Sequence, residues 1–204
     1  PYAAPLLLRG VAFRSSRAEP FGEAFLRRAV ERLLDFDLVG VREAYVATVV
    51  ALRRRQLPTF DVSSRVRLTK SPAQYLATRQ QRRELPYEAM LENGREHWRV
   101  GERVHVYRRS GGRPGLWLEA VGVDGDEAFA AVGHDPRDYD VEHYVKQLHS
   151  AFATRLARGM AQEDFLAVVT DPNQPTLFQR PLAARKPVLT VHHEPAAPLL
   201  DSSS

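Results

Sequence analysis

The sequence predicts an α+β fold that is mostly helical, with a small antiparallel β-hairpin or sheet and a flexible C-terminal tail. Apolar residues recur at helical spacing in 21–34, 41–52 and 141–156. Strict alternation of apolar and polar residues in 65–70 and 103–107 predicts short strands instead. Long helical stripes beside short strands favour a helical core that carries a smaller β-containing part.

Two antiparallel helices are predicted first along the chain. Pro20 suits the first turn of a helix, where the backbone N–H that proline lacks has no partner. The polar stretch 35–37 breaks the apolar periodicity, and the second helix begins after Gly40. That helix ends before Pro58, because the residue preceding a proline disfavours helical geometry.

Shorter elements follow. Ser71 and Gln74 have the spacing of a capping box, which predicts a helix from 72 to about 83. Another short helix begins at Pro86 and ends at the Asn93-Gly94 signal.

A glycine-rich turn and a capping residue mark the later elements. The turn at 110–115 joins the strand 103–107 to a partner strand at 116–123. Asp140 is well placed to cap the helix 141–156. From residue 170 onward Pro and Ser punctuate a weakly hydrophobic stretch, which is typical of a tail.

Composition narrows the classes of function. The chain has no cysteine, which excludes disulfides and thiolate metal sites and suits a reducing compartment such as the cytoplasm. No apolar run approaches the roughly 18 residues that span a bilayer, so no membrane partner is expected. Residues 1–118 carry 22 Lys and Arg against 12 Asp and Glu, whereas residues 119–204 carry 7 against 13. The basic first part favours a polyanion as ligand, although arginines that only solvate helix faces would give the same composition.

No catalytic constellation is predicted within this chain. The acidic stretch 124–127 lacks the spacing of a calcium loop. Its acidic residues are better explained as the polar residues of an ordinary turn. The sequence His192-His193-Glu194 falls in the expected tail, where a preformed metal site is not expected. We therefore expect no cofactor and no metal on this chain.

A binding site is better supported, because cations recur on several consecutive elements together with hydroxyl side chains. Contacts of this type hold phosphates without reading base sequence. The predicted DNA-binding residues are Arg14, Arg17, Arg65, Arg67, Thr69, Lys70, Ser71, Arg79, Arg99 and Arg103. The run 53–55 fits a solvated helix end at least as well, and Tyr107 and Trp117 fit either packing or stacking on bases.

Residues 9–170 resemble the thumb of family B DNA polymerases. The order and spacing of several segments carry the resemblance. They are Arg9-Gly10-Val11 followed by Arg14, the helix pair around Phe25–Leu34 and Val41–Leu52, the stretch from Leu68-Thr69-Lys70 to Tyr75, Trp98 to Tyr107, and Asp138-Tyr139-Asp140-Val141-Glu142-His143-Tyr144-Val145. The chain departs from the family at Pro86-Tyr87, where many relatives have Pro-His, which puts the role of the family histidine in doubt.

The resemblance implies a module that wraps primer–template DNA and holds it against a palm domain. Thr69 and Lys70 would then lie near backbone phosphates. The motifs of the palm aspartates and the exonuclease carboxylates do not occur in this sequence, so Mg²⁺ is expected only in a separate palm. Expected partners are double-stranded primer–template DNA and the palm and exonuclease domains of a parent polymerase.

The predicted domains follow the same resemblance. Residues 1–169 form the thumb-like domain, with an entry segment and helix pair in 1–60 and a β-containing tip and closing helix in 61–169. Residues 170–204 form a largely disordered tail. Pro1 in place of a starting methionine is consistent with a fragment of a longer protein.

A short peptide in this tail resembles the clamp-binding motif of bacterial replication proteins. It reads Gln174-Pro175-Thr176-Leu177-Phe178. Leu177 and Phe178 would fill an apolar pocket on the sliding clamp while Gln174 forms a hydrogen bond at its edge. The alternative is that Leu177 and Phe178 fold back onto the thumb.

The sequence is compatible with three functions. The first is a polymerase thumb that works beside DNA in the cytoplasm and is not active alone. The second is a stand-alone replication or repair accessory protein derived from a polymerase, with no catalytic domain in the same chain. The third is an unrelated soluble enzyme, for which no cluster of residues can be named.

Overall fold

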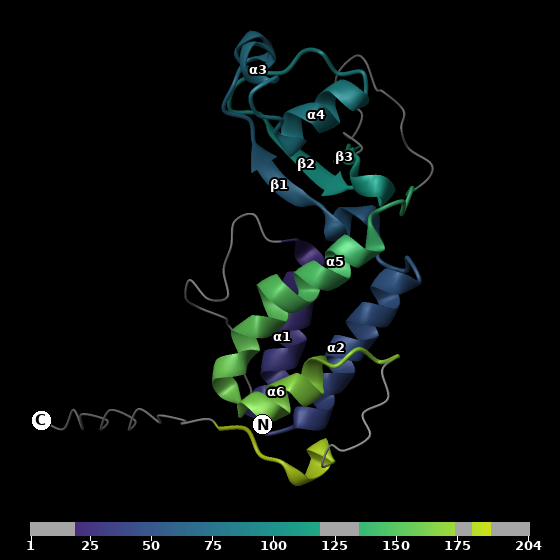
Figure 1. Ribbon diagram of the computed structural model, residues 1–204, viewed down its shortest axis with the longest axis vertical. Coiled ribbons are helices and arrows are strands. Elements are labelled where there is room, and N and C mark those ends of the chain that lie inside the picture. Colours follow the sequence, from purple (N-terminus) through teal and green to yellow (C-terminus); the bar gives the residue numbers. More distant parts are fainter. Residues whose placement is uncertain (1–18, 119–134, 174–180, 189–204) are drawn as a thin grey trace, which may run out of the picture.

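The computed structural model describes residues 19–118, 135–173 and 181–188. Within these residues the fold is α+β, as predicted, with six α-helices and one antiparallel three-stranded sheet. Figure 1 shows two stacked parts, a helical bundle formed by α1, α2, α5 and α6 and a tip formed by the sheet with α3 and α4. Each part has its own hydrophobic core.

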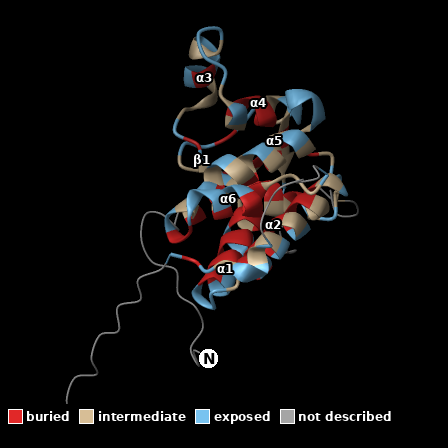
Figure 2. Ribbon diagram, turned by 60° about the horizontal axis from the view of Figure 1, so that its bottom comes forward, coloured by how far each residue is buried: buried red, intermediate tan, exposed pale blue. Residues whose placement is uncertain are grey.

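The bundle is built from helices that are distant in sequence. Its members are α1 (Pro20–Leu34), α2 (Leu38–Arg53), α5 (Val141–Gln147) and α6 (Gln162–Val169). Figure 2 shows buried residues in red on the inner sides of α1 and α2. Large side chains that are almost fully buried here are Phe25, Leu26, Val41, Leu52, Tyr139, Leu148, Phe152 and Leu156.

The second helix begins earlier than predicted. Asp37 caps it by accepting a 2.8 Å hydrogen bond from the backbone of Gly40, so that α2 starts at Leu38 rather than after Gly40. An aspartate at this position satisfies one of the free N–H groups of the first turn. The turn before it is tight, because Phe36 adopts a positive φ of 59°.

The closing helix is not regular to its end. After α5 the chain passes through one wide turn at Leu148–Phe152 and then a tighter helical segment at Ala153–Gly159. The hydroxyl groups of Ser150 and Thr154 donate to the carbonyls four residues earlier, at 2.8 and 2.9 Å. Such side-chain bonds compete with the helical backbone and bend helices. The sequence predicted one continuous helix to about 156 and did not predict α6.

In the tip, one face of the sheet is covered. The strands β1 (Ser64–Arg67), β2 (Arg103–Arg108) and β3 (Pro114–Trp117) lie in that order. The helices α3 (Pro72–Thr78) and α4 (Leu85–Glu92) supply Tyr75, Tyr87 and Met90 to a core. This core also takes in Val66, Val104, Val106, Leu116 and Trp98. The alternation of β1 and β2 therefore directs every second side chain into the tip core.

Two elements of the tip are shorter than predicted. The capping box of Ser71 and Gln74 is present, but α3 ends at Thr78 and not near 83. The hydroxyl of Thr78 lies 3.2 Å from the carbonyls of Gln74 and Tyr75. The first strand ends at Arg67, and soon after it the backbone N–H groups of Thr69 and Lys70 donate to the hydroxyl of Tyr87 on α4 instead of to a strand.

Part of the segment predicted as a tail is packed on the bundle. Arg53 holds Asp171 through two hydrogen bonds of 2.9 and 2.6 Å, and these lower the pKa of Asp171 to about 2. Arg185 forms an ion pair with the buried Asp164, and Leu182 packs against the bundle core. None of the helices described in the structure is long and apolar enough to cross a membrane.

A close contact between α1 and the wide turn generates a prediction for stability. A Cβ added to Gly22 would lie 2.1 Å from the ring of Phe152, which is 1% exposed. We expect Gly22→Ala to lower the free energy of unfolding by about 1–3 kcal/mol through overpacking. On an open helix the same change would be stabilising by about 1 kcal/mol.

Chemical denaturation measures this effect. Arg27→Ala on the exposed side of α1 is the control and should stay within about 0.5 kcal/mol of the wild type. A Gly22→Ala protein more stable than the wild type would contradict the close contact.

Candidate nucleic-acid interface

The second face of the sheet carries the largest group of predicted DNA-binding residues that the structure brings together. The register pairs Arg67 with Arg103 and Arg65 with His105, so these side chains share the face opposite the tip core. Arg65, Arg67 and Arg103 are all exposed. Residues directly opposite on antiparallel strands have Cβ atoms about 5 Å apart. Three guanidinium groups are thus concentrated on one small surface.

These three arginines have no ion pair with any carboxylate in the described part of the chain. Like charges directly opposite one another destabilise a sheet. Gly101 contributes to the geometry, since its positive φ of 93° turns the chain tightly beside Arg67. A Cβ at Gly101 would lie 3.3 Å from a terminal nitrogen of Arg67. The surface is therefore one that an anion would stabilise.

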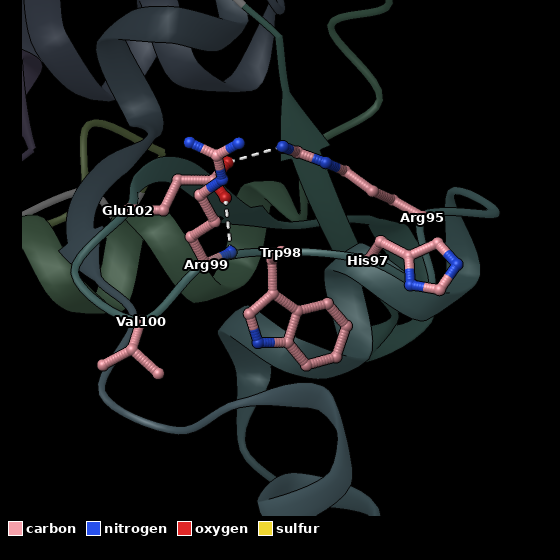
Figure 3. Close-up of a pocket in the computed structure, with 6 residues that line it drawn as sticks. All are labelled: Arg95, His97, Trp98, Arg99, Val100 and Glu102. Atoms are coloured by element: carbon pink, nitrogen blue, oxygen red, sulfur yellow. Dashed lines mark hydrogen bonds and ion pairs between the residues drawn. The ribbon is translucent and has the colours of Figure 1, made fainter.

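Arg99 lies in the turn that leads into β2. Together with Arg95, His97, Trp98, Val100 and Glu102 it lines an open depression of about 590 Å³. Figure 3 shows Glu102 bound both to Arg95, at 2.6 Å, and to the backbone N–H of Arg99, at 3.1 Å. The side chain of Arg99 is exposed and has no ion pair among the described residues, so it adds a fourth cation near β2.

Thr69, Lys70 and Ser71 are engaged within the tip instead. The hydroxyl of Tyr87 accepts hydrogen bonds from the backbone N–H groups of Thr69 and Lys70, at 3.0 and 2.9 Å. Lys70 also forms a 2.7 Å ion pair with Glu84. Ser71 caps α3. Tyr87 is thus the residue that fixes this loop.

Arg79 is neutralised in the same way. Its guanidinium forms two hydrogen bonds with Glu88, of 2.7 and 2.9 Å. The hydrogen bonds from Arg79, together with one from the hydroxyl of Tyr75, lower the pKa of Glu88. A bidentate pair of this kind is the strong form of a charge-assisted hydrogen bond. Arg79 therefore contributes to the fold of the tip.

The remaining candidates fall outside the described residues. These are Arg14, Arg17, Gln174, Leu177 and Phe178, together with the acidic stretch 124–127 and the histidines at 192–193. Among the residues that are described, no group of three or more His, Asp or Glu side chains is arranged to hold a metal ion.

The sequence left two alternatives open, and the structure shows internal contacts for both, although Trp117 is only half-buried. Arg53 binds Asp171, and Arg55 donates to the carbonyls of Arg137 and Tyr139 at 2.6 Å. The ring of Tyr107 is buried, and its hydroxyl donates to Asp138 at 2.8 Å. Burial and this hydrogen bond raise the pKa of Tyr107. Trp117 packs partly against the bundle core.

The carboxylates that neutralise the predicted cations could not be recognised from the sequence. Glu84 lies 14 residues from Lys70, and Glu88 lies 9 residues from Arg79. No local pattern connects such pairs, because the turn between α3 and α4 brings them together. The alternation of β1 and β2 did place Arg65, Arg67 and Arg103 on one side, and that part of the site could be predicted.

No protein-family model matches this chain, and no curated protein matches its sequence. The function must therefore be inferred from the arginine face and from the sequence itself.

The opposed arginines generate a prediction for the free protein. Replacing Arg67 by Gln should raise the free energy of unfolding by a few tenths of a kcal/mol to about 1 kcal/mol at low salt. The gain should shrink as added salt screens the repulsion. Thermal unfolding at two salt concentrations measures both effects. Arg27→Gln on α1 serves as the control, and a destabilised Arg67→Gln protein would show that Arg67 has a structural partner.

Proposed function

We propose that this chain is a DNA-holding module, the thumb of a family B DNA polymerase, which grips primer–template duplex through its phosphate backbone. The observation that carries the proposal is the arginine face, defined as Arg65, Arg67 and Arg103 without carboxylate partners in the described residues. The sequence resemblance to polymerase thumbs supports the same assignment. Catalysis and Mg²⁺ would belong to the palm of a parent polymerase.

Electrostatics favours phosphate as the ligand of this face. Each arginine that neutralises a phosphate releases a condensed counterion, and this release drives binding regardless of sequence. The guanidinium fork also matches the geometry of phosphate oxygens. Several neighbouring arginines that have no carboxylate partner among the described residues suit the successive phosphates of a polymer, such as cytoplasmic or nucleoid DNA, better than one small anion.

Tethering to the sliding clamp is the second part of the proposal. The motif Gln174 to Phe178 follows directly on Asn173, whose backbone N–H donates to Asp171 at 2.8 Å. Asp171 in turn is held by Arg53 of α2. The peptide would therefore begin directly after a segment that is held on the bundle.

The duplex proposal is tested by fluorescence anisotropy of a labelled primer–template at several salt concentrations. We expect the logarithm of the binding constant to fall linearly with the logarithm of salt concentration. In the double variant Arg67→Gln/Arg103→Gln the slope should be smaller by about 2, because two phosphate contacts are lost. The control Arg27→Gln/Arg28→Gln removes the same charge from the exposed side of α1. Equal losses of DNA affinity in both variants would show that binding depends on the net charge of the chain and not on the arginine face.

The clamp proposal is tested with the double variant Leu177→Ala/Phe178→Ala. Loss of both apolar anchors should weaken binding to a purified bacterial sliding clamp by at least about 100-fold, since anchor residues cost about 2 kcal/mol or more each. Surface plasmon resonance measures the affinity, and duplex binding in the same variant should be unchanged. Clamp binding that survives the double variant would remove the peptide from the proposal.

A further inference from the structure

A row of flat rings lies beside the arginine face. The register aligns Arg65 of β1, His105 of β2 and Trp117 of β3 across the sheet, on the same face as Arg67 and Arg103. The ring of Phe60 lies 5.1 Å from the ring of His105, with an angle of 34° between the two planes. Phe60, His105 and Trp117 are each half-buried. We call these three residues the ring row.

The ring row is fixed in place by its surroundings. Phe60 belongs to the short helical turn Thr59–Val62, and its carbonyl accepts from both the N–H and the hydroxyl of Ser63, at 3.0 and 2.7 Å. The same hydroxyl lies 3.3 Å from Nδ1 of His105. Thr59 is held by the carboxylate of Asp135, and Trp117 packs partly on the bundle core. The rings therefore keep their orientation without a ligand.

We propose that the ring row stacks bases of single-stranded nucleic acid that continues from the duplex held by the arginine face. This inference rests on the proposed function, because the arginines bind the phosphates of the same strand. It adds the residues that would contact the unpaired bases next to that duplex, namely the ring row.

Unpaired bases suit the ring row better than paired bases for two reasons. Bases within a duplex are already stacked on one another, whereas unpaired bases expose faces that aromatic side chains can cover. A cationic groove interleaved with aromatic rings is the usual surface for single strands, and it tolerates any sequence because each base has a π-face. Here Arg65 lies in the same row as the rings, so phosphate and base contacts can alternate along one strand.

The test compares three labelled ligands of the wild-type chain by fluorescence anisotropy at one salt concentration. They are a blunt duplex, the same duplex with an unpaired overhang of six nucleotides, and the same overhang with abasic nucleotides. The abasic overhang has the same phosphates but no bases, so it separates stacking from charge. We expect the normal overhang to bind about tenfold more tightly than the abasic one, as one stacked base allows.

Two variants then test which residue is responsible for the preference for the normal overhang over the abasic one. Phe60→Leu keeps an apolar side chain on the half-buried site and should remove most of the preference, while binding of blunt duplex stays the same. Phe36→Leu is the matched control, because Phe36 is 47% exposed in the turn between α1 and α2, away from the sheet. Thermal unfolding checks that both variants are folded.

The outcomes are distinguishable. Equal binding of the normal and abasic overhangs by the wild type would overturn the inference even if Phe60→Leu is unstable, and the duplex proposal would stand. An overhang preference unchanged in a folded Phe60→Leu variant would likewise exclude the ring row as its source. If the chain binds the duplex with the normal overhang but does not bind the blunt duplex, base stacking on the ring row is supported. The same result would overturn the proposal that the arginine face holds duplex DNA.

Discussion

The arrangement of the tip on the bundle depends on a polar junction around Asp138. Its carboxylate accepts hydrogen bonds from the hydroxyl of Tyr107, at 2.8 Å, and from Arg109, at 2.6 Å. Arg55 reaches across to the carbonyls of the neighbouring return segment, and the hydroxyl of Tyr144 accepts from the backbone of Arg108 at 2.8 Å. Three chain segments meet here, and each supplies donors to another. Since partly buried charge-assisted bonds are strong and directional, they orient the sheet relative to the helices.

Arginines of this chain fall into two groups with different roles. Arg53, Arg55, Arg79 and Arg109 bind carboxylates or carbonyls and hold the fold together. The arginine face, by contrast, has no such partner in the described residues and faces its own like charges. Proteins retain such local destabilisation where function requires it. The contrast between neutralised and unneutralised arginines is therefore more informative about binding than the net charge of the chain.

Local patterns predicted much of the fold. The stripe of α1, the capping box at Ser71 and the alternation of β1 and β2 each depend on neighbours within a few residues, so the sequence suffices to predict them. The wide turn after α5, by contrast, was not predicted; Phe152 in this turn packs against Gly22 of α1, which is far away in the sequence. Of the candidate site, the sequence predicted which strand residues share a face but not which cations are neutralised.

The α+β class, the positions of most helices and strands, and the concentration of cations in the first part of the chain all follow from the amino-acid sequence alone. These follow from periodicity and composition, which are local properties. The pairing of Lys70 and Arg79, the burial of Tyr107 and the contact of Phe60 with His105 depend instead on how the chain folds in three dimensions. The physical reason is that ion pairs and ring contacts need atoms within a few ångströms, and residues distant in sequence reach that separation only after the chain has folded.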